Sequence, residues 1–140
     1  MNYRILLVEN DPDLRDIVQD ILEDEGYDVI PAAHGRQALE YLRTTRSRDD
    51  APALVILDLM MPIVTGWEVL DAIRDDPWLQ MPVIVISALG HSEPNGVAAY
   101  LRKPFSLNDL LDAVRGAPCE PPREERERAA QEGWFDDGNI

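Results

Sequence analysis

Asp58 carries the strongest chemical signal in this sequence. It follows the apolar run 53–57, and a carboxylate at the mouth of a buried strand costs free energy unless it has a partner or a use. Polar groups also follow three other apolar runs, as Glu9-Asn10 after residues 5–8, Ser87 after 83–86 and Lys103 after 100–101. An ionised aspartate can attack phosphorus and form an acyl phosphate. The four positions together therefore predict chemistry on a phosphoryl group.

A divalent cation completes this prediction, because the carboxylate must approach a phosphoryl group that is already anionic. Mg²⁺ binds a few carboxylate or carbonyl oxygens and keeps several waters, and Glu9, Asp58 and the backbone carbonyl of Met60 can supply that set. Lys103 offers a mobile positive charge for the phosphoryl oxygens. The hydroxyl of Ser87 can hydrogen-bond one of these oxygens.

Strand and helix signals alternate along the chain. Strands are predicted at residues 5–8, 27–32, 53–57, 83–86 and 97–102, and helices at 12–26, 34–45, 67–76 and from 106 onward. The first helix has Asp11 as its cap and Pro12 in its first turn, and the last has a capping-box-like start at Ser106 and Asp109. This alternation predicts a parallel sheet with helices on both faces, which binds ligands beyond the carboxyl ends of its strands.

In their order and spacing, the four strand-end signals resemble the receiver domain of two-component response regulators, over about residues 3–115. The resemblance implies an α/β fold, a flavodoxin-like, doubly wound, five-stranded parallel sheet in the order 2-1-3-4-5. It implies that Asp58 is the phosphoacceptor, assisted by Lys103 and Ser87, and that Ser87 and Tyr100 form the switch. The implied cofactor is Mg²⁺, with the ligands Glu9, Asn10, Asp58 and the carbonyl of Met60.

Two features depart from the receiver pattern. Asn10 stands where the family usually places an aspartate that binds the metal, so we expect weaker Mg²⁺ affinity; Asp11 is an alternative ligand, although its place as a helix cap argues against it. The segment between Ser87 and Lys103 is short and rich in helix breakers, so the fourth helix is predicted to be shortened or missing. We hypothesise that this segment, residues 88–99, orders on phosphorylation or partner binding.

Charge and composition narrow the setting. The 27 acidic and 13 basic residues give a net charge of -14, which opposes binding to nucleic acid or to anionic membranes. The single cysteine cannot form an internal disulfide, and no signal peptide or membrane-spanning run is visible, so we expect a cytoplasmic protein. Residues 1–116 are predicted to form the receiver domain, and residues 117–140 a charged tail with a linker and a short helix.

The sequence thus predicts a single-domain response regulator rather than a small-molecule enzyme. It would accept a phosphoryl group on Asp58 from a sensor histidine kinase or a histidine phosphotransfer protein and signal to a downstream protein, and a homodimer is left open. One alternative is a degenerate receiver that acts as an interaction module without phosphorylation. Another is a small α/β phosphohydrolase. Such an enzyme would normally need a second carboxylate near Asp58 as acid or base, and the residue two positions after Asp58 is Met60, which cannot take this role. His34 and His91 are assigned no role, and Trp67 and Tyr41 are predicted to pack in the core or partly buried rather than to stack on a ligand.

Overall fold

The computed structural model describes residues 3–45, 51–60, 64–77, 79, 81–88 and 94–117. Strands and helices follow one another as β1 (Arg4–Val8), α1 (Pro12–Asp24), β2 (Asp28–Ala32), α2 (Gly35–Arg43), β3 (Leu54–Asp58), α3 (Gly66–Asp75), β4 (Val83–Ser87), β5 (Ala99–Arg102) and α4 (Leu107–Gly116). The strands form one parallel sheet in the order β2-β1-β3-β4-β5. The predicted fold class and strand order are confirmed.

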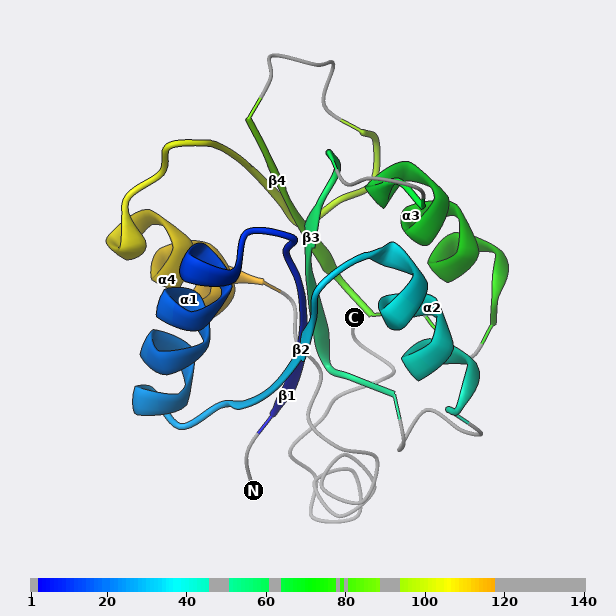
Figure 1. Ribbon diagram of the computed structural model, residues 1–140, viewed down its shortest axis with the longest axis horizontal. Helices are drawn as coiled ribbons and strands as arrows, with labels where there is room; N and C mark the ends of the chain where they lie inside the picture. Colours follow the sequence, from blue (N-terminus) through cyan, green and yellow to red (C-terminus); the bar gives the residue numbers. More distant parts are fainter. Residues whose placement is uncertain are drawn as a thin grey trace, which may run out of the picture.

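The sheet is covered on both faces, with α1 and α4 on one side and α2 and α3 on the other (Figure 1). Successive residues of a strand point to opposite faces, so apolar runs such as 5–8 and 54–57 serve both layers. Leu6 and Leu57 pack with Leu70 of α3, whereas Leu7 and Ile56 pack with residues of α1 and α4. The strands that lead to Glu9, Asp58 and Ser87 therefore end in the buried core, whereas β5, which leads to Lys103, is only partly buried.

Each helix begins at a side chain that accepts a hydrogen bond from the first turn. These caps are Asp11, His34, Thr65 and Ser106. Such caps satisfy backbone N–H groups that have no partner inside the helix. The helix predicted at 34–45 is α2, whose cap is His34: its Nδ1 accepts from the N–H of Gln37 at 3.3 Å. His34 therefore has a structural role that the sequence did not indicate.

No helix lies between β4 and β5 in the residues that are described there, so the helix after β5 is α4. This agrees with the prediction that the fourth helix of the pattern is shortened or missing. The fifth strand is shorter than predicted, since it begins at Ala99 rather than residue 97. Before it, Arg74 of α3 donates a hydrogen bond to the backbone carbonyl of Asn95, and Gly96 has a φ of 78.

Several predictions concern segments outside the described residues. They are residues 46–50 of the polar loop predicted at 46–52, residues 89–93 with His91, and the tail beyond Ala117. Among the described residues, none of the helices has the length and apolar character needed to cross a membrane.

Candidate functional site

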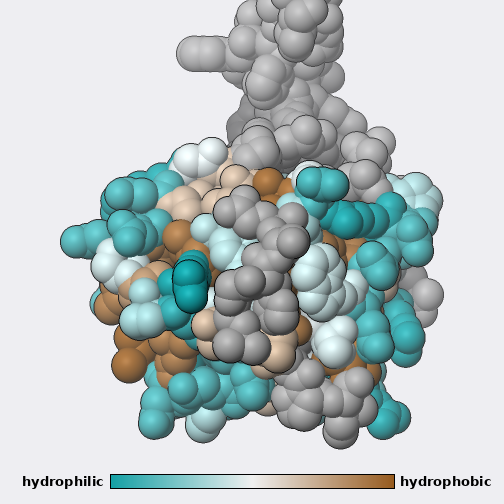
Figure 2. All heavy atoms as spheres, turned by 90° about the horizontal axis from the view of Figure 1, so that it is seen from above, coloured by the Kyte–Doolittle hydropathy of each residue, from teal (hydrophilic) through white to brown (hydrophobic). Residues whose placement is uncertain are grey.

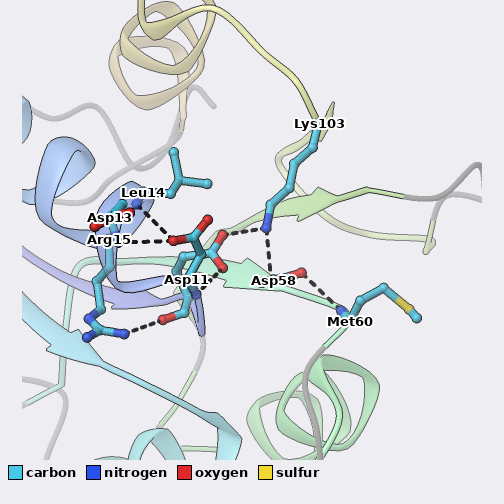
Figure 3. A network of polar contacts seen from close by, with 8 residues as sticks. Asp11, Asp13, Leu14, Arg15, Asp58, Met60 and Lys103 are labelled. Carbon is cyan, nitrogen blue, oxygen red and sulfur yellow. Dashed lines mark hydrogen bonds and ion pairs between the residues drawn. The ribbon is translucent and has the colours of Figure 1, made fainter.

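The predicted site residues meet at the carboxyl end of the sheet, where β1, β3 and β5 lead into their loops (Figure 3). Asp58 is the last residue of β3, and Glu9 directly follows β1, which is the neighbour of β3. The two acidic residues are nearly closed to water, with 0% exposure for Glu9 and 1% for Asp58. Neighbouring parallel strands thus bring together two carboxylates that are 49 residues apart in sequence.

Lys103 supplies the charge that balances these carboxylates. Its Nζ lies 2.6 Å from Oε1 of Glu9 and 3.2 Å from Oδ2 of Asp58. Within the described part of the chain, Lys103 is the sole polar partner of Glu9 Oε1. The backbone N–H of Lys103 also donates to the carbonyl of Ser87 at 2.7 Å. The lysine is therefore fixed to the end of β4 while its side chain reaches both acids.

The other oxygens of the two carboxylates are held by the loops that follow their strands. The N–H of Met60 donates to Oδ1 of Asp58 at 3.0 Å, and the N–H of Asp11 donates to Oε2 of Glu9 at 3.0 Å. With its amide nitrogen turned inward, Asn10 donates to Oε2 of Glu9 and Oδ2 of Asp58, both at 3.0 Å. Every carboxylate oxygen of the pair thus has a partner.

Burial makes Asp58 harder to ionise than an exposed aspartate. Desolvation is the largest influence and raises its pKa to about 6; the Met60 hydrogen bond lowers it, the charge of Glu9 raises it and Lys103 lowers it. For Lys103, burial alone would lower the pKa, but the hydrogen bond to Glu9 and the charges of both carboxylates raise it above the ordinary value. At neutral pH we therefore expect an ionised Asp58 beside a firmly protonated lysine.

Two glycines let the loop after β3 pack closely. A Cβ added at Gly66 would lie 2.3 Å from the backbone oxygen of Asp58 and 2.5 Å from the Cα of Leu59. A Cβ at Gly35 would lie 2.6 Å from the backbone oxygen of Val64. Because these neighbours are backbone atoms that cannot turn aside, only glycine allows α2 and α3 to approach the Asp58 loop this closely.

The residues present can hold a divalent cation. Adjacent ligands of an octahedral Mg²⁺, each about 2.1 Å from the metal, lie about 3 Å apart. The inward-facing atom of the Asn10 amide lies 3.0 Å from Glu9 Oε2 and 3.0 Å from Asp58 Oδ2, so this spacing is present. No group of three or more His, Cys, Asp or Glu side chains suited to a metal is found in the described residues. Glu9, Asp58 and the Asn10 amide oxygen therefore fit Mg²⁺ as a set of two carboxylates and one neutral oxygen.

The remaining predicted residues lie on β4, on β5, at the start of α1 and in α3. Ser87, the last residue of β4, is fully buried, while Tyr100 on β5 pairs with Val85 and is half-buried. Asp11 accepts from the N–H groups of Asp13 and Leu14, so its cap role agrees with the prediction. The side chain of Trp67 is 37% exposed, which is more than predicted. Trp67 lies in the first turn of α3.

Three contributions were missed in the sequence. Arg15 of α1 donates to the backbone carbonyl of Glu9 at 2.9 Å, the Asn10 amide bridges both carboxylates, and Gly66 permits the tight loop. Asn10 was singled out as a metal ligand with one charge fewer than aspartate, but not as a hydrogen-bond donor. No local pattern marks Arg15, since its partner is a main-chain atom.

Comparison with known proteins agrees with this fold. Residues 5–115 match the response regulator receiver domain family, and the chain belongs to this family. It is 37% identical over 118 residues to the transcriptional regulatory protein CpxR of Escherichia coli K12, covering 80% of this chain and 47% of CpxR. The chain spans about half the length of the curated relatives it matches.

Solved structures give the same result at the level of the domain. The chemotaxis response regulator CheY4 of Vibrio cholerae has a TM-score of 0.71 and 28% identity, with 82% of this chain and 98% of CheY4 covered. The response regulator TrrA of Thermotoga maritima, solved in complex with Mg²⁺-BeF, has a TM-score of 0.69 and 29% identity, with coverages of 81% and 96%. The chain is a two-component receiver domain, a signalling module rather than a small-molecule enzyme, and this family generally uses Mg²⁺ and a phosphorylated aspartate.

Proposed function

We propose that this receiver accepts a phosphoryl group on Asp58 from a phosphohistidine of a sensor kinase or a histidine phosphotransfer protein. The observation that carries the proposal is the position of Asp58 at the end of β3, beside Glu9 and within 3.2 Å of the Lys103 ammonium. A carboxylate placed there is a nucleophile with its counter-charge already in place. Attack by a carboxylate oxygen on phosphorus would form the acyl phosphate and release the imidazole of the donor.

Glu9, Asp58, the Asn10 side-chain oxygen and the Met60 carbonyl would hold Mg²⁺, which when bound neutralises charge between the nucleophile and the phosphoryl group. The N–H of Met60 would keep the spectator oxygen Oδ1 of Asp58 in place, since it already donates to that atom. Lys103 would turn its ammonium from Asp58 to the phosphoryl oxygens while keeping its contact with Glu9.

Ser87 and Tyr100 are the proposed switch. Ser87 lies on β4, next to β3, and would move its hydroxyl to a phosphoryl oxygen on Asp58. Because the Ser87 carbonyl accepts from the N–H of Lys103, movement at the end of β4 would pass directly to the segment after β5. Tyr100, which is half-buried on β5, would change its packing in response. These steps would carry the state of Asp58 to the surface around β4 and β5.

The α1 side of the molecule supports docking of the phosphoryl donor. Ile17 on α1 is 49% exposed, and hydrophobic residues reach the surface on the α1 and α4 side when the carboxyl end of the sheet is viewed from above (Figure 2). An exposed aliphatic side chain on α1, the helix that begins just after Glu9, suits a helical partner that must bring its histidine to Asp58. We further propose that this receiver signals in the cytoplasm through contacts with a downstream protein, either as a monomer or as a homodimer.

A second candidate is the interaction module that works without phosphorylation. The observation in its favour is Asn10, which leaves the site with two carboxylates and balances them with an internal lysine and an amide. Such a site can be stable without a cation or a phosphoryl group. The two candidates differ in one property, whether Asp58 is chemically reactive.

Intact-protein mass after incubation with acetyl phosphate distinguishes the two functions. The wild-type protein and Asp58→Ala are titrated with Mg²⁺, and Asp71→Ala, an exposed aspartate of α3, is the matched control. Metal-dependent gain of one phosphoryl group by the wild type and Asp71→Ala, with none by Asp58→Ala, is the expected result. No gain by the wild type at any Mg²⁺ concentration would contradict the phosphoacceptor function and favour the interaction module.

A further inference from the structure

The side-chain amide of Asn10 can present either its nitrogen or its oxygen to the two carboxylates, and the two orientations suit different states. When its amide nitrogen faces inward, it donates to Oε2 of Glu9 and Oδ2 of Asp58 at 3.0 Å each. When its carbonyl oxygen faces inward, three acceptor oxygens converge at the same distances. Such a group of acceptors repels itself unless a cation lies among them.

We propose that Asn10 is a positioning residue that locks the metal-free site through its amide nitrogen and must rotate to present its oxygen when Mg²⁺ binds. The inference rests on the proposed phosphoacceptor role of Asp58. It concerns what holds the nucleophile before the cation arrives. An aspartate at this position could be a ligand but could not be a lock, because an ionised carboxylate donates no hydrogen bond.

The Asn10 amide holds the nucleophile Asp58 directly, through a hydrogen bond to its carboxylate. With the amide nitrogen of Asn10 inward, Oδ2 of Asp58 accepts hydrogen bonds from this amide at 3.0 Å and from the Lys103 ammonium at 3.2 Å. Its Oδ1 accepts one from the Met60 N–H at 3.0 Å. Both oxygens are therefore engaged in the resting protein. Rotation of the amide removes one of the two donors from Oδ2 and presents an oxygen ligand in its place, so metal binding and loss of this hydrogen bond become one event.

The surroundings permit this rotation. Asn10 lies at the molecular surface, whereas Glu9 and Asp58 beneath it are buried. An amide turning at the surface displaces no core side chain. The hydrogen bond of Glu9 Oε2 to the Asp11 N–H and the ion pair of its Oε1 with Lys103 do not involve Asn10, so Glu9 stays in place as the amide turns.

Thermal unfolding in EDTA tests the lock without any phosphorylation. Asn10→Ala removes the donors and adds no charge, Asn10→Asp removes them and adds a carboxylate, and Asn108→Asp adds the same charge at an exposed position on α4. We expect both Asn10 variants to lower Tm by about 5 °C or more and Asn108→Asp to leave it nearly unchanged. A drop for Asn10→Asp alone would overturn the proposal, because charge repulsion would then explain the whole effect.

Exchange of side-chain amide protons with water, measured by NMR on the wild-type protein, tests the rotation. In EDTA we expect the Asn10 NH₂ protons to exchange at least tenfold more slowly than those of exposed Asn108, and Mg²⁺ to abolish the difference. Equal exchange in EDTA, or slow exchange that persists at saturating Mg²⁺, would overturn the proposal. A protein that fails to take a phosphoryl group would refute the proposed function and leave both of these results unaffected.

Discussion

The Lys103 ammonium lies 2.6 Å from Oε1 of Glu9, a carboxylate with no exposure to water. This ion pair joins the end of β1 to the loop after β5 across β3 and β4, and Asp58 lies beside it. The same lysine is the cation that the proposed chemistry moves to the phosphoryl group. Its resting position therefore links the stability of the metal-free domain to the phosphorylation site.

Replacing the lysine should leave two buried carboxylates without their counter-charge. We expect Lys103→Met to lower the free energy of unfolding in EDTA by about 2–4 kcal/mol at pH 8. The loss should be smaller at pH 5, where a carboxyl group can take up a proton, and smaller in saturating Mg²⁺. Denaturant unfolding measures these differences, with Arg102→Met, a change at the exposed neighbouring cation, as the control. Equal losses for the two variants would show that the Lys103 ion pairs add nothing.

Asp58 should make the metal-free protein less stable as the pH rises. Its pKa of about 6 lies above the ordinary value of 3.8, so the folded state holds the proton more tightly than the unfolded state does. The resulting stabilisation is present below pH 4 and is lost as the pH rises through 6, a change of about 3 kcal/mol at 1.36 kcal/mol per pH unit. Asp58→Asn lacks this group, so it should gain about 2–3 kcal/mol relative to wild type between pH 4 and pH 7.

Urea unfolding in EDTA across this range measures the gain. Asp71→Asn, a change at an exposed aspartate of α3, serves as the control that should track the wild type. If Asp58→Asn also tracked the wild type from pH 4 to pH 7, burial would not be opposing ionisation of Asp58.

The same pKa should appear in the rate of phosphorylation, because only the ionised carboxylate attacks phosphorus. At limiting Mg²⁺, the initial rate with a small phosphodonor should fall by up to about tenfold per pH unit below pH 6. Saturating Mg²⁺ favours the ionised form, so it should move the midpoint to lower pH. Initial rates from intact-protein mass provide the profile, after correction for the ionisation of the phosphodonor. A corrected rate that is flat down to pH 5 would be inconsistent with this pKa.

Gly66 should be intolerant of even a methyl group. In Gly66→Ala the new Cβ would collide with the backbone of Asp58 and Leu59, and we expect a loss of about 2–3 kcal/mol together with slower phosphorylation. Gly116→Ala is the matched control, because no atom lies within 4 Å of its Cβ and alanine favours a helix. Unfolding and phosphorylation rates of both variants test this. A Gly66→Ala protein as stable and as reactive as Gly116→Ala would rule out the close approach.

Much of the fold could be predicted because its signals are local. The apolar runs 5–8 and 53–57 give the strands, and Asp11 and Ser106 mark helix starts through hydrogen bonds to residues two or three positions away. The convergence of Glu9 and Asp58 needed the strand order as well, which came from the resemblance to receivers and which the sheet confirms.

The missed features are those that depend on contacts between distant segments. The donor role of Asn10 requires knowing that two carboxylates face it, and the need for glycine at position 66 appears only when α3 is placed against the end of β3. The exposure of Trp67 likewise depends on where α3 begins relative to the surface. Residue type alone encodes none of these distances.

The most direct test of the central claim is to locate the modified residue. The protein is phosphorylated with acetyl phosphate and Mg²⁺ and then reduced with borohydride, which converts an aspartyl phosphate to homoserine, and its peptides are sequenced by mass spectrometry. The account predicts homoserine in place of Asp58 and unmodified residues at Glu9, Asp11 and Ser87. Modification at another residue, or a phosphoryl group that survives reduction as a serine ester, would contradict it.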